Sequence, residues 1–99
     1  MCKKDLFNRI LDIVSSETEV NVEAIINTKN KTLEVVDARF LLVYFLNREG
    51  YNIPYISKNL HITNQCANYI IRNFDDRRKI SGKMFEITFQ RIRKMLENN

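Results

Sequence analysis

Three amide side chains lie close together in the second half of the chain, at Asn64, Gln65 and Asn68, just after Thr63. Asparagine and glutamine can each pair bidentately with the N6 and N7 edge of adenine, and threonine can bond to either kind of base edge. No acidic residue follows before Asp75. If the stretch is helical, the amides predict a face that reads base edges in the major groove of DNA and prefers adenine. The alternative is an ordinary polar helix face.

Other side chains could hold a phosphate backbone, since lysine and arginine neutralise phosphates and tyrosine can donate a hydrogen bond to them. The predicted backbone contacts are Lys29, Lys31, Arg39, Lys58, Tyr69 and Arg72. A further basic run, Arg77-Arg78-Lys79 with Lys83 after it, has two interpretations. It either reaches phosphates or forms a solvated connection that complements the C-terminal end of a helix dipole.

Catalytic and metal chemistry find little support in the residues. Cys2, Cys66 and His61 are too few for a disulfide framework or a metal site. No nucleophile, base and orienting group are spaced as a catalytic set, so we predict that the chain is not an enzyme. We also predict no cofactor and no small-molecule ligand. His61 is interpreted as a turn residue, and a redox role for Cys66 is the less favoured alternative to a purely structural one.

The elements that would position the amides form a helix-turn-helix pattern between residues 56 and 74. Its apolar residues are Ile56, Leu60, Ile62, Ala67, Ile70 and Phe74. Two helices that cross steeply need a small residue where they meet, and Ser57 lies at that point. Ile62 would fill the turn, and Ala67 would face inward from the second helix. His61 stands where such turns usually have glycine, which leaves open which turn residue is left-handed.

Helical periodicity extends over most of the chain. The expected helices span about residues 6–14, 20–26, 33–48, 53–60 and 63–76, with a final one after Ser81. Polar residues 15–19 should break the first helix, and residues 27–32 read as a polar loop. The third helix is apolar around most of its circumference, so it should be central, and Gly50 should end it. The predicted N-caps are Asn21, Asn52, Thr63 and Ser81.

Composition agrees with a single small all-α domain over residues 1–99. Two glycines and one proline in 99 residues are too few for the turns of a β-sandwich or barrel. No window reaches the 18 or so apolar residues of a membrane helix, and the charged start does not read as a signal peptide, so we expect a cytoplasmic protein without membrane contact. The net charge of +4 is uneven: residues 1–50 carry seven basic and eight acidic residues, and residues 51–99 carry nine and four. A basic half suits nucleic acid, and a basic solvated surface is the alternative.

With these residues in place, the chain from Leu6 to about Leu96 resembles the C-terminal DNA-binding domain of the DnaA replication initiators. Residues 20–26 look like that domain's short helix, residues 27–32 like its basic loop, and residues 39–48 like its long helix, with an arginine near the start. Residues 53–56 resemble its leucine-proline-acid-isoleucine step, and residues 63–74 fall on its recognition helix. The resemblance implies a Trp-repressor-like bundle of about six helices, with double-stranded DNA as the partner.

The chain departs from that family at the residues that read bases. The family signature is Asp-His-Thr-Thr-Val, whereas residues 63–67 are Thr-Asn-Gln-Cys-Ala and the turn is about one residue shorter. The family's target sequence therefore does not transfer. Lys29 and Lys31 stand where the family places arginines that enter the minor groove. No Gly-rich phosphate loop occurs in the chain, so the resemblance implies a regulator of transcription or replication without an ATPase module.

The sequence therefore predicts sequence-selective binding of double-stranded DNA through a helix-turn-helix. The alternative is a protein–protein interaction module on the same scaffold, because the first half is nearly neutral and the signature base readers are absent. A homodimer also stays open, since the final helix could pack on the domain or pair with a second copy.

Overall fold

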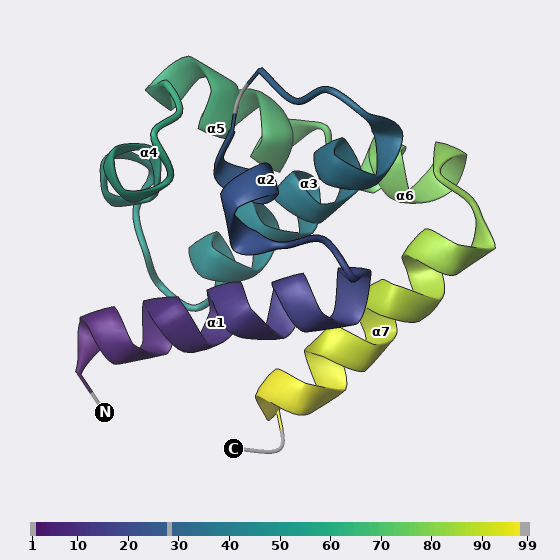
Figure 1. Cartoon of the computed structure of the whole chain (residues 1–99), viewed down its shortest axis with the longest axis horizontal. Helices are drawn as coiled ribbons and strands as arrows, with labels where there is room; N and C mark the ends of the chain where they lie inside the picture. The colour runs from purple at the N-terminus through teal and green to yellow at the C-terminus, as the bar shows by residue number, and fades with distance from the viewer. Residues whose placement is uncertain (1, 28, 98–99) are drawn as a thin grey trace.

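The long helix α3 (Leu33–Arg48), which is apolar around most of its circumference, lies at the centre of the molecule (Figure 1). The computed structural model describes residues 2–27 and 29–97. Ala38, Leu42, Val43 and Leu46 of α3 have no exposed surface, which is expected of a helix that other elements cover on several sides. The predicted bounds and the central position of this helix are confirmed.

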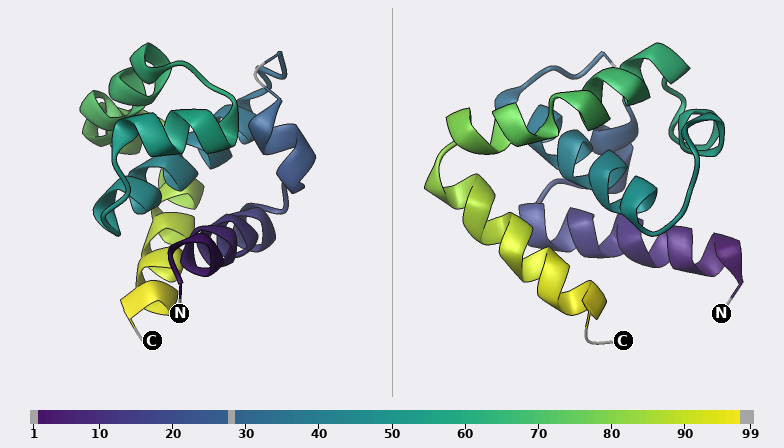
Figure 2. Two further views of the ribbon diagram at one scale, coloured as in Figure 1. Left: turned by 90° about the vertical axis from the view of Figure 1, so that its left-hand side faces the viewer. Right: turned by 180° about the vertical axis from the view of Figure 1, so that it is seen from behind.

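The other helices surround α3. On one side of α3 lies α1 (Lys3–Thr18), with α7 (Lys83–Glu97) packed against α1, and on the other lie α4 (Ile53–Leu60) and α5 (Asn64–Arg72), as Figures 1 and 2 show. The short helix α2 (Val22–Ile26) packs on α3, and α6 (Phe74–Ile80) links α5 to α7. Within the described residues there is no strand, so the all-α class is confirmed. Seven helices occur there, one more than expected.

Local capping follows the sequence closely. The side-chain oxygen of Asn21 accepts a hydrogen bond from the Ala24 N–H at 2.8 Å, and Asn52 and Thr63 do the same for residues three positions later. Gly50 adopts a φ of +104° after α3. These predictions are confirmed because each depends only on atoms within one helical turn.

The first helix is longer than its apolar pattern indicates. Residues 15–18 continue α1, and the break comes at Glu19, whose φ is +58°. The hydroxyl of Thr18 donates to the carbonyl of Val14 at 2.6 Å, and that of Ser15 donates to the carbonyl of Val20 at 2.7 Å. Polar side chains that bond to nearby carbonyls do not interrupt a helix, so the expected break over residues 15–19 is corrected.

The helix predicted over residues 63–76 is two helices. α5 ends at Arg72, and at the next residue the side-chain amide of Asn73 donates to the Tyr69 carbonyl at 2.8 Å, beside the backbone bond to the same oxygen. The bend turns Phe74 inward, where its ring stacks on Tyr44 with centroids 4.0 Å apart. The new helix α6 then carries residues 77–79, which the sequence had placed in a connection.

Ser81 does not have the predicted role of N-cap of the final helix. It is the C-cap residue of α6, and its hydroxyl donates to Oδ1 of Asp37 at 3.3 Å. The final helix begins at Lys83, after Gly82. Across the described ranges, no helix combines the length and apolar character needed to cross a bilayer.

Candidate nucleic-acid interface

The helices α4 and α5 are consecutive and joined by a turn of residues 61–63. Their axes are steeply inclined, since Figure 1 shows α4 end-on while α5 lies across the view. His61 is the left-handed residue, with φ +58° and ψ +39°, and the N–H groups of His61 and Ile62 both donate to the Ser57 carbonyl. This geometry settles which turn residue carries the positive φ.

The apolar pattern of these two helices has the predicted burial. Ser57 is 5% exposed and Ala67 is fully buried, so each helix contributes a small inward residue. Ile62 fills the turn at 9% exposed, and Ile70 continues the inward face of α5. The packing of α4 on α5 leaves the opposite face of α5 in solvent.

The predicted base-reading residues lie together on that solvent face. Asn64, Gln65 and Asn68 are exposed, and no hydrogen bond to another described residue occupies their side-chain amides. Thr63 is also exposed, but its hydroxyl oxygen accepts the Cys66 N–H at 3.0 Å, so the hydroxyl is partly engaged as the cap of α5. The amides are therefore available to an external partner.

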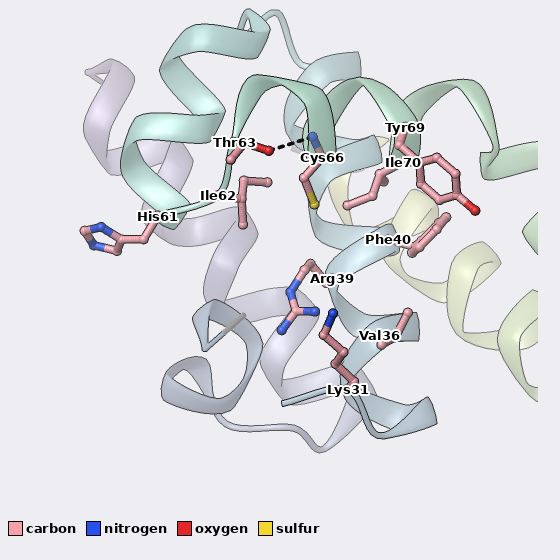
Figure 3. Close-up of a pocket in the computed structure, with 10 residues that line it drawn as sticks. All are labelled: Lys31, Val36, Arg39, Phe40, His61, Ile62, Thr63, Cys66, Tyr69 and Ile70. Carbon is pink, nitrogen blue, oxygen red and sulfur yellow. Dashed lines mark hydrogen bonds between the residues drawn. The ribbon is translucent and has the colours of Figure 1, made fainter. Parts of the chain in front are cut away.

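Most of the predicted backbone-contacting residues are exposed around α5. Lys58 projects from α4 and Arg72 from the last turn of α5. Lys29 and Lys31 belong to the loop before α3, and Lys31 lines the same groove as Thr63 and Tyr69, which places this loop beside α5 (Figure 3). Tyr69 is 57% exposed and contacts the ring of Phe40 edge-on.

Arg39 is the exception, and its prediction is corrected. Its residue is only 7% exposed. Nε donates to the carbonyl of Ile25 at 2.9 Å, and Nη2 donates to the carbonyls of Asn27 and Asn30 at 2.9 and 3.4 Å. Arg39 therefore holds the loop in place from beneath and does not reach a phosphate outside. One signal in the sequence could have found this role: Arg39 stands four residues after Val35, on a face of α3 that is otherwise apolar.

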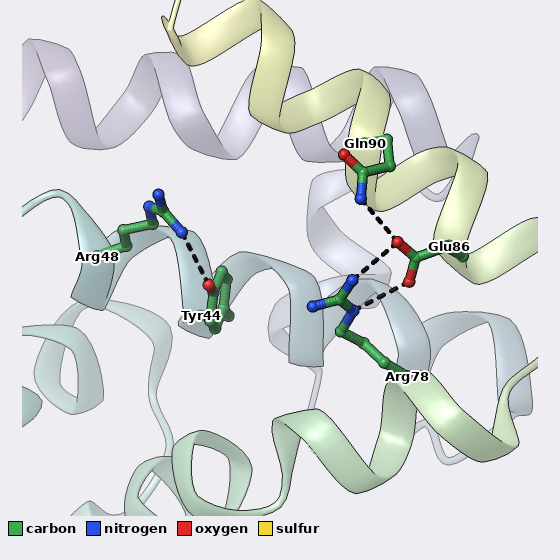
Figure 4. A network of polar contacts seen from close by, with 5 residues as sticks. All are labelled: Tyr44, Arg48, Arg78, Glu86 and Gln90. Atoms are coloured by element: carbon green, nitrogen blue, oxygen red, sulfur yellow. Dashed lines mark hydrogen bonds and ion pairs between the residues drawn. The ribbon is translucent and has the colours of Figure 1, made fainter.

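The basic run of residues 77–79 is largely engaged inside the protein. Arg77 forms a salt bridge with Asp37 at 2.7 Å. Arg78 donates from Nε and Nη2 to Glu86 at 2.9 and 2.8 Å, and Gln90 donates to the same carboxylate at 2.7 Å (Figure 4). These bonds lower the pKa of the Glu86 carboxyl and raise the pKa of Arg78. Arg77 and Arg78 therefore fit neither interpretation of this run, because carboxylates of the protein itself engage both side chains.

A groove runs along the other flank of α5, between α5, the first half of α3 and the loop. It has a volume of about 420 Å³. Val36, Phe40, Ile62 and Ile70 form its walls, and the sulfur of Cys66 points into it in Figure 3. We call it the α3–α5 groove. The sequence did not predict it because its walls come from separate segments.

Comparisons with protein-family models, with curated proteins and with solved structures found no match for this chain. In the part of the chain that the structure describes, no three side chains among histidine, cysteine, aspartate and glutamate gather as a metal ion would require. Any function proposed for this chain therefore rests on its own residues and their geometry.

Proposed function

We propose that this protein binds double-stranded DNA sequence-selectively, with α4 and α5 acting as a helix-turn-helix and α5 entering the major groove. One observation carries the proposal: the solvent face of α5 presents Asn64, Gln65 and Asn68 with their amides unoccupied within the described structure. An exposed helix without a partner to read more often alternates glutamate and lysine, which stabilise each other at i,i+4 spacing. Amides give up that stabilisation but match the N6 and N7 edge of adenine.

The surroundings of α5 support an anionic partner. Lys58 on α4, Arg72 on α5 and the two loop lysines Lys29 and Lys31 are exposed, and none of them forms a salt bridge to a described residue. Unpaired cations around a base-reading helix suit phosphate contacts, which position a protein on the duplex. We leave Arg39 out of this set because its guanidinium is committed to the loop.

The resemblance to the DNA-binding domain of the DnaA initiators agrees with this proposal and stays a hypothesis. It concerns the arrangement of helices and a basic loop beside the recognition helix. The base-reading residues differ, so we propose a different target, rich in adenine at the positions that Gln65 and Asn68 would contact. A role in transcription or in replication would then depend on where that target lies.

The experiment that tests the proposal is selection of binding sites from a random duplex library, followed by fluorescence anisotropy on the selected site. Changing Gln65 and Asn68 together to alanine should cost roughly 1–3 kcal/mol for each lost bidentate pair. The control is Asn8→Ala, which removes an exposed amide from α1, far from α5 in sequence. Equal affinities of the double variant and the control, or enrichment of no motif, would contradict the assignment of α5.

A protein–protein interaction module is the second candidate, favoured by one observation. Ile80 on α6 and Met84 on α7 are 78% and 72% exposed, and Ile87 is 41% exposed one turn later. Met84 and Ile87 lie three positions apart, and so on one face of α7, and adjoining exposed apolar side chains are typical of interaction surfaces. An electrophoretic mobility-shift assay with random-sequence duplex at low salt separates the two functions. An unshifted duplex, together with concentration-dependent self-association or a partner protein recovered by pull-down, would favour the interaction module over DNA binding.

A further inference from the structure

The α3–α5 groove has the dimensions and walls of a small-molecule site. Val36 and Phe40 of α3 face Ile62 and Ile70 of the turn and α5 across it. The exposed ring of Tyr69 stands at its edge against Phe40, with centroids 6.4 Å apart. Small-molecule sites in proteins are concave and mainly apolar, with a few polar groups that fix the ligand's orientation.

The charges of the groove are all of one sign. Its charged lining residues are Lys31 and Arg39, and no described carboxylate lines it. Neither cation forms a salt bridge with another described residue. In Figure 3 the amine of Lys31 rises towards the guanidinium of Arg39, so two positive charges share one end of the groove.

The burial of Arg39 raises the free energy of the folded protein when no anion is bound nearby. This residue is more than nine-tenths buried, and its hydrogen bonds to described residues go to neutral carbonyl oxygens of α2 and the loop. Burial of a cation without a counter-charge raises the free energy of the folded state. The same burial lowers the pKa of Arg39, although an arginine stays charged at neutral pH. An anion at this end of the groove would compensate both cations.

We propose that the α3–α5 groove binds a small amphipathic anion. Its apolar body lies against Val36 and Phe40, and its carboxylate, sulfonate or phosphate group lies at the exposed amine of Lys31, where the buried positive charge of Arg39 adds to the attraction. Binding itself does not rest on the proposed function. One consequence of binding does rest on the proposed function. Because Lys31 is a proposed DNA contact, a ligand that neutralises its charge should weaken DNA binding.

The probe for this site is 8-anilinonaphthalene-1-sulfonate, a fluorescent aromatic anion, and its matched control is neutral N-phenyl-1-naphthylamine. The full chain should bind one sulfonate probe per molecule, several-fold more tightly than the neutral compound, and the probe should shift the amide resonances of Cys66 and Tyr69. Equal affinity for both compounds would overturn the role of the cations. Non-saturating fluorescence, or shifts spread evenly over all helices, would overturn the groove as the site.

Two variants test where the anionic group and the apolar body of the probe bind in the groove. Lys31→Gln should weaken the sulfonate probe roughly two- to five-fold, as loss of an exposed ion pair does. Lys29→Gln, in the same loop but outside the lining, should leave its affinity unchanged, and equal weakening by both variants would overturn the proposal. Val36→Phe should fill the groove and weaken binding more than ten-fold, with circular dichroism checking the fold. If Val36→Phe does not fold, the comparison of Lys31→Gln with Lys29→Gln still tests whether the anion binds at Lys31.

The effect on DNA is measured separately, on the site selected above. A saturating concentration of the sulfonate probe should lower DNA affinity, and Lys31→Gln should lower it without the probe. Probe binding at the groove with no change in DNA affinity would overturn the regulatory consequence alone. Failure of DNA binding altogether would contradict the proposed function while leaving the groove site standing.

Discussion

The Nε of Arg39 donates a hydrogen bond to the carbonyl oxygen of Ile25 at 2.9 Å, across fourteen positions of the chain. The same guanidinium bonds to Asn27 and Asn30. One side chain from the central helix therefore joins the end of α2 to the loop that carries Lys29 and Lys31. The position of those lysines beside α5 depends on this buried arginine.

Arg39→Met should lower the free energy of unfolding by about 2–3 kcal/mol, because the carbonyls that accept from a charged group lose their partner in a buried place. Urea unfolding followed by circular dichroism measures it. The matched variant is Arg48→Met, at the exposed end of α3, where the one side-chain bond of the arginine to a described residue is to the Tyr44 hydroxyl at 3.0 Å. That change should stay within about 0.5 kcal/mol. Similar losses in both variants would show that Arg39 does not have the structural role described.

His61→Gly should stabilise the protein by roughly 0.5–1 kcal/mol. A non-glycine residue at φ +58° is strained, and glycine relieves this strain while losing more backbone entropy on folding. His61→Ala is the control, since it removes the imidazole but keeps the Cβ, and it should leave stability close to that of the original chain. Thermal and urea unfolding of the three proteins would compare them. A glycine variant no more stable than the alanine variant would contradict the strain argument.

Glu86 should make stability depend on pH in the acid range. The hydrogen bonds from Arg78 and Gln90 hold the pKa of the folded-state carboxyl below its ordinary value of 4.5. The unfolded chain therefore takes up the proton first as pH falls, so the contribution of Glu86 is present above about pH 4.5 and is lost as pH falls through the lower, folded-state pKa. Because the carboxylate is partly exposed, Glu86→Gln should cost only about 0.5–1 kcal/mol at pH 7.

The free energy of unfolding of Glu86→Gln should therefore differ from that of the original chain at pH 7. This difference should become smaller as the pH falls towards 3. Urea unfolding at several pH values measures it. The matched comparison is Glu97→Gln, which changes an exposed carboxylate on the same helix that has no salt bridge to a described residue. A Glu86→Gln difference that stays constant with pH would contradict the pairing.

Lys58→Ala should reduce the slope of log K against log salt concentration for DNA binding by about 1, because one phosphate contact and its released counterion are lost. The loss should be similar for all duplex sequences, since phosphates carry no sequence information. Lys4→Ala removes an exposed charge from α1 and should leave the slope unchanged. An unchanged slope in the Lys58 variant would remove α4 from the proposed interface.

Turns and caps could be predicted from the sequence because their energetics are local. Asn21, Asn52 and Thr63 each bond to a backbone N–H three residues away, within the first turn of the helix they begin. Gly50 has the positive φ expected after α3. The inward positions of α4 and α5, such as Ser57 and Ala67, followed from helical periodicity together with the need for small residues where two helices meet.

What the sequence determined by itself was therefore the all-α class, most helix boundaries and the amide face of α5. Only the tertiary structure decided which cations are engaged inside the protein. Arg39, Arg77 and Arg78 look like surface cations in the sequence, but their partners lie 8 to 40 positions away, at Ile25, Asp37 and Glu86. The same is true of the break at Asn73, because Phe74 turns inward to a ring on α3. Such pairings form only after helices have packed, since periodicity within one helix carries no information about which distant side chain it meets.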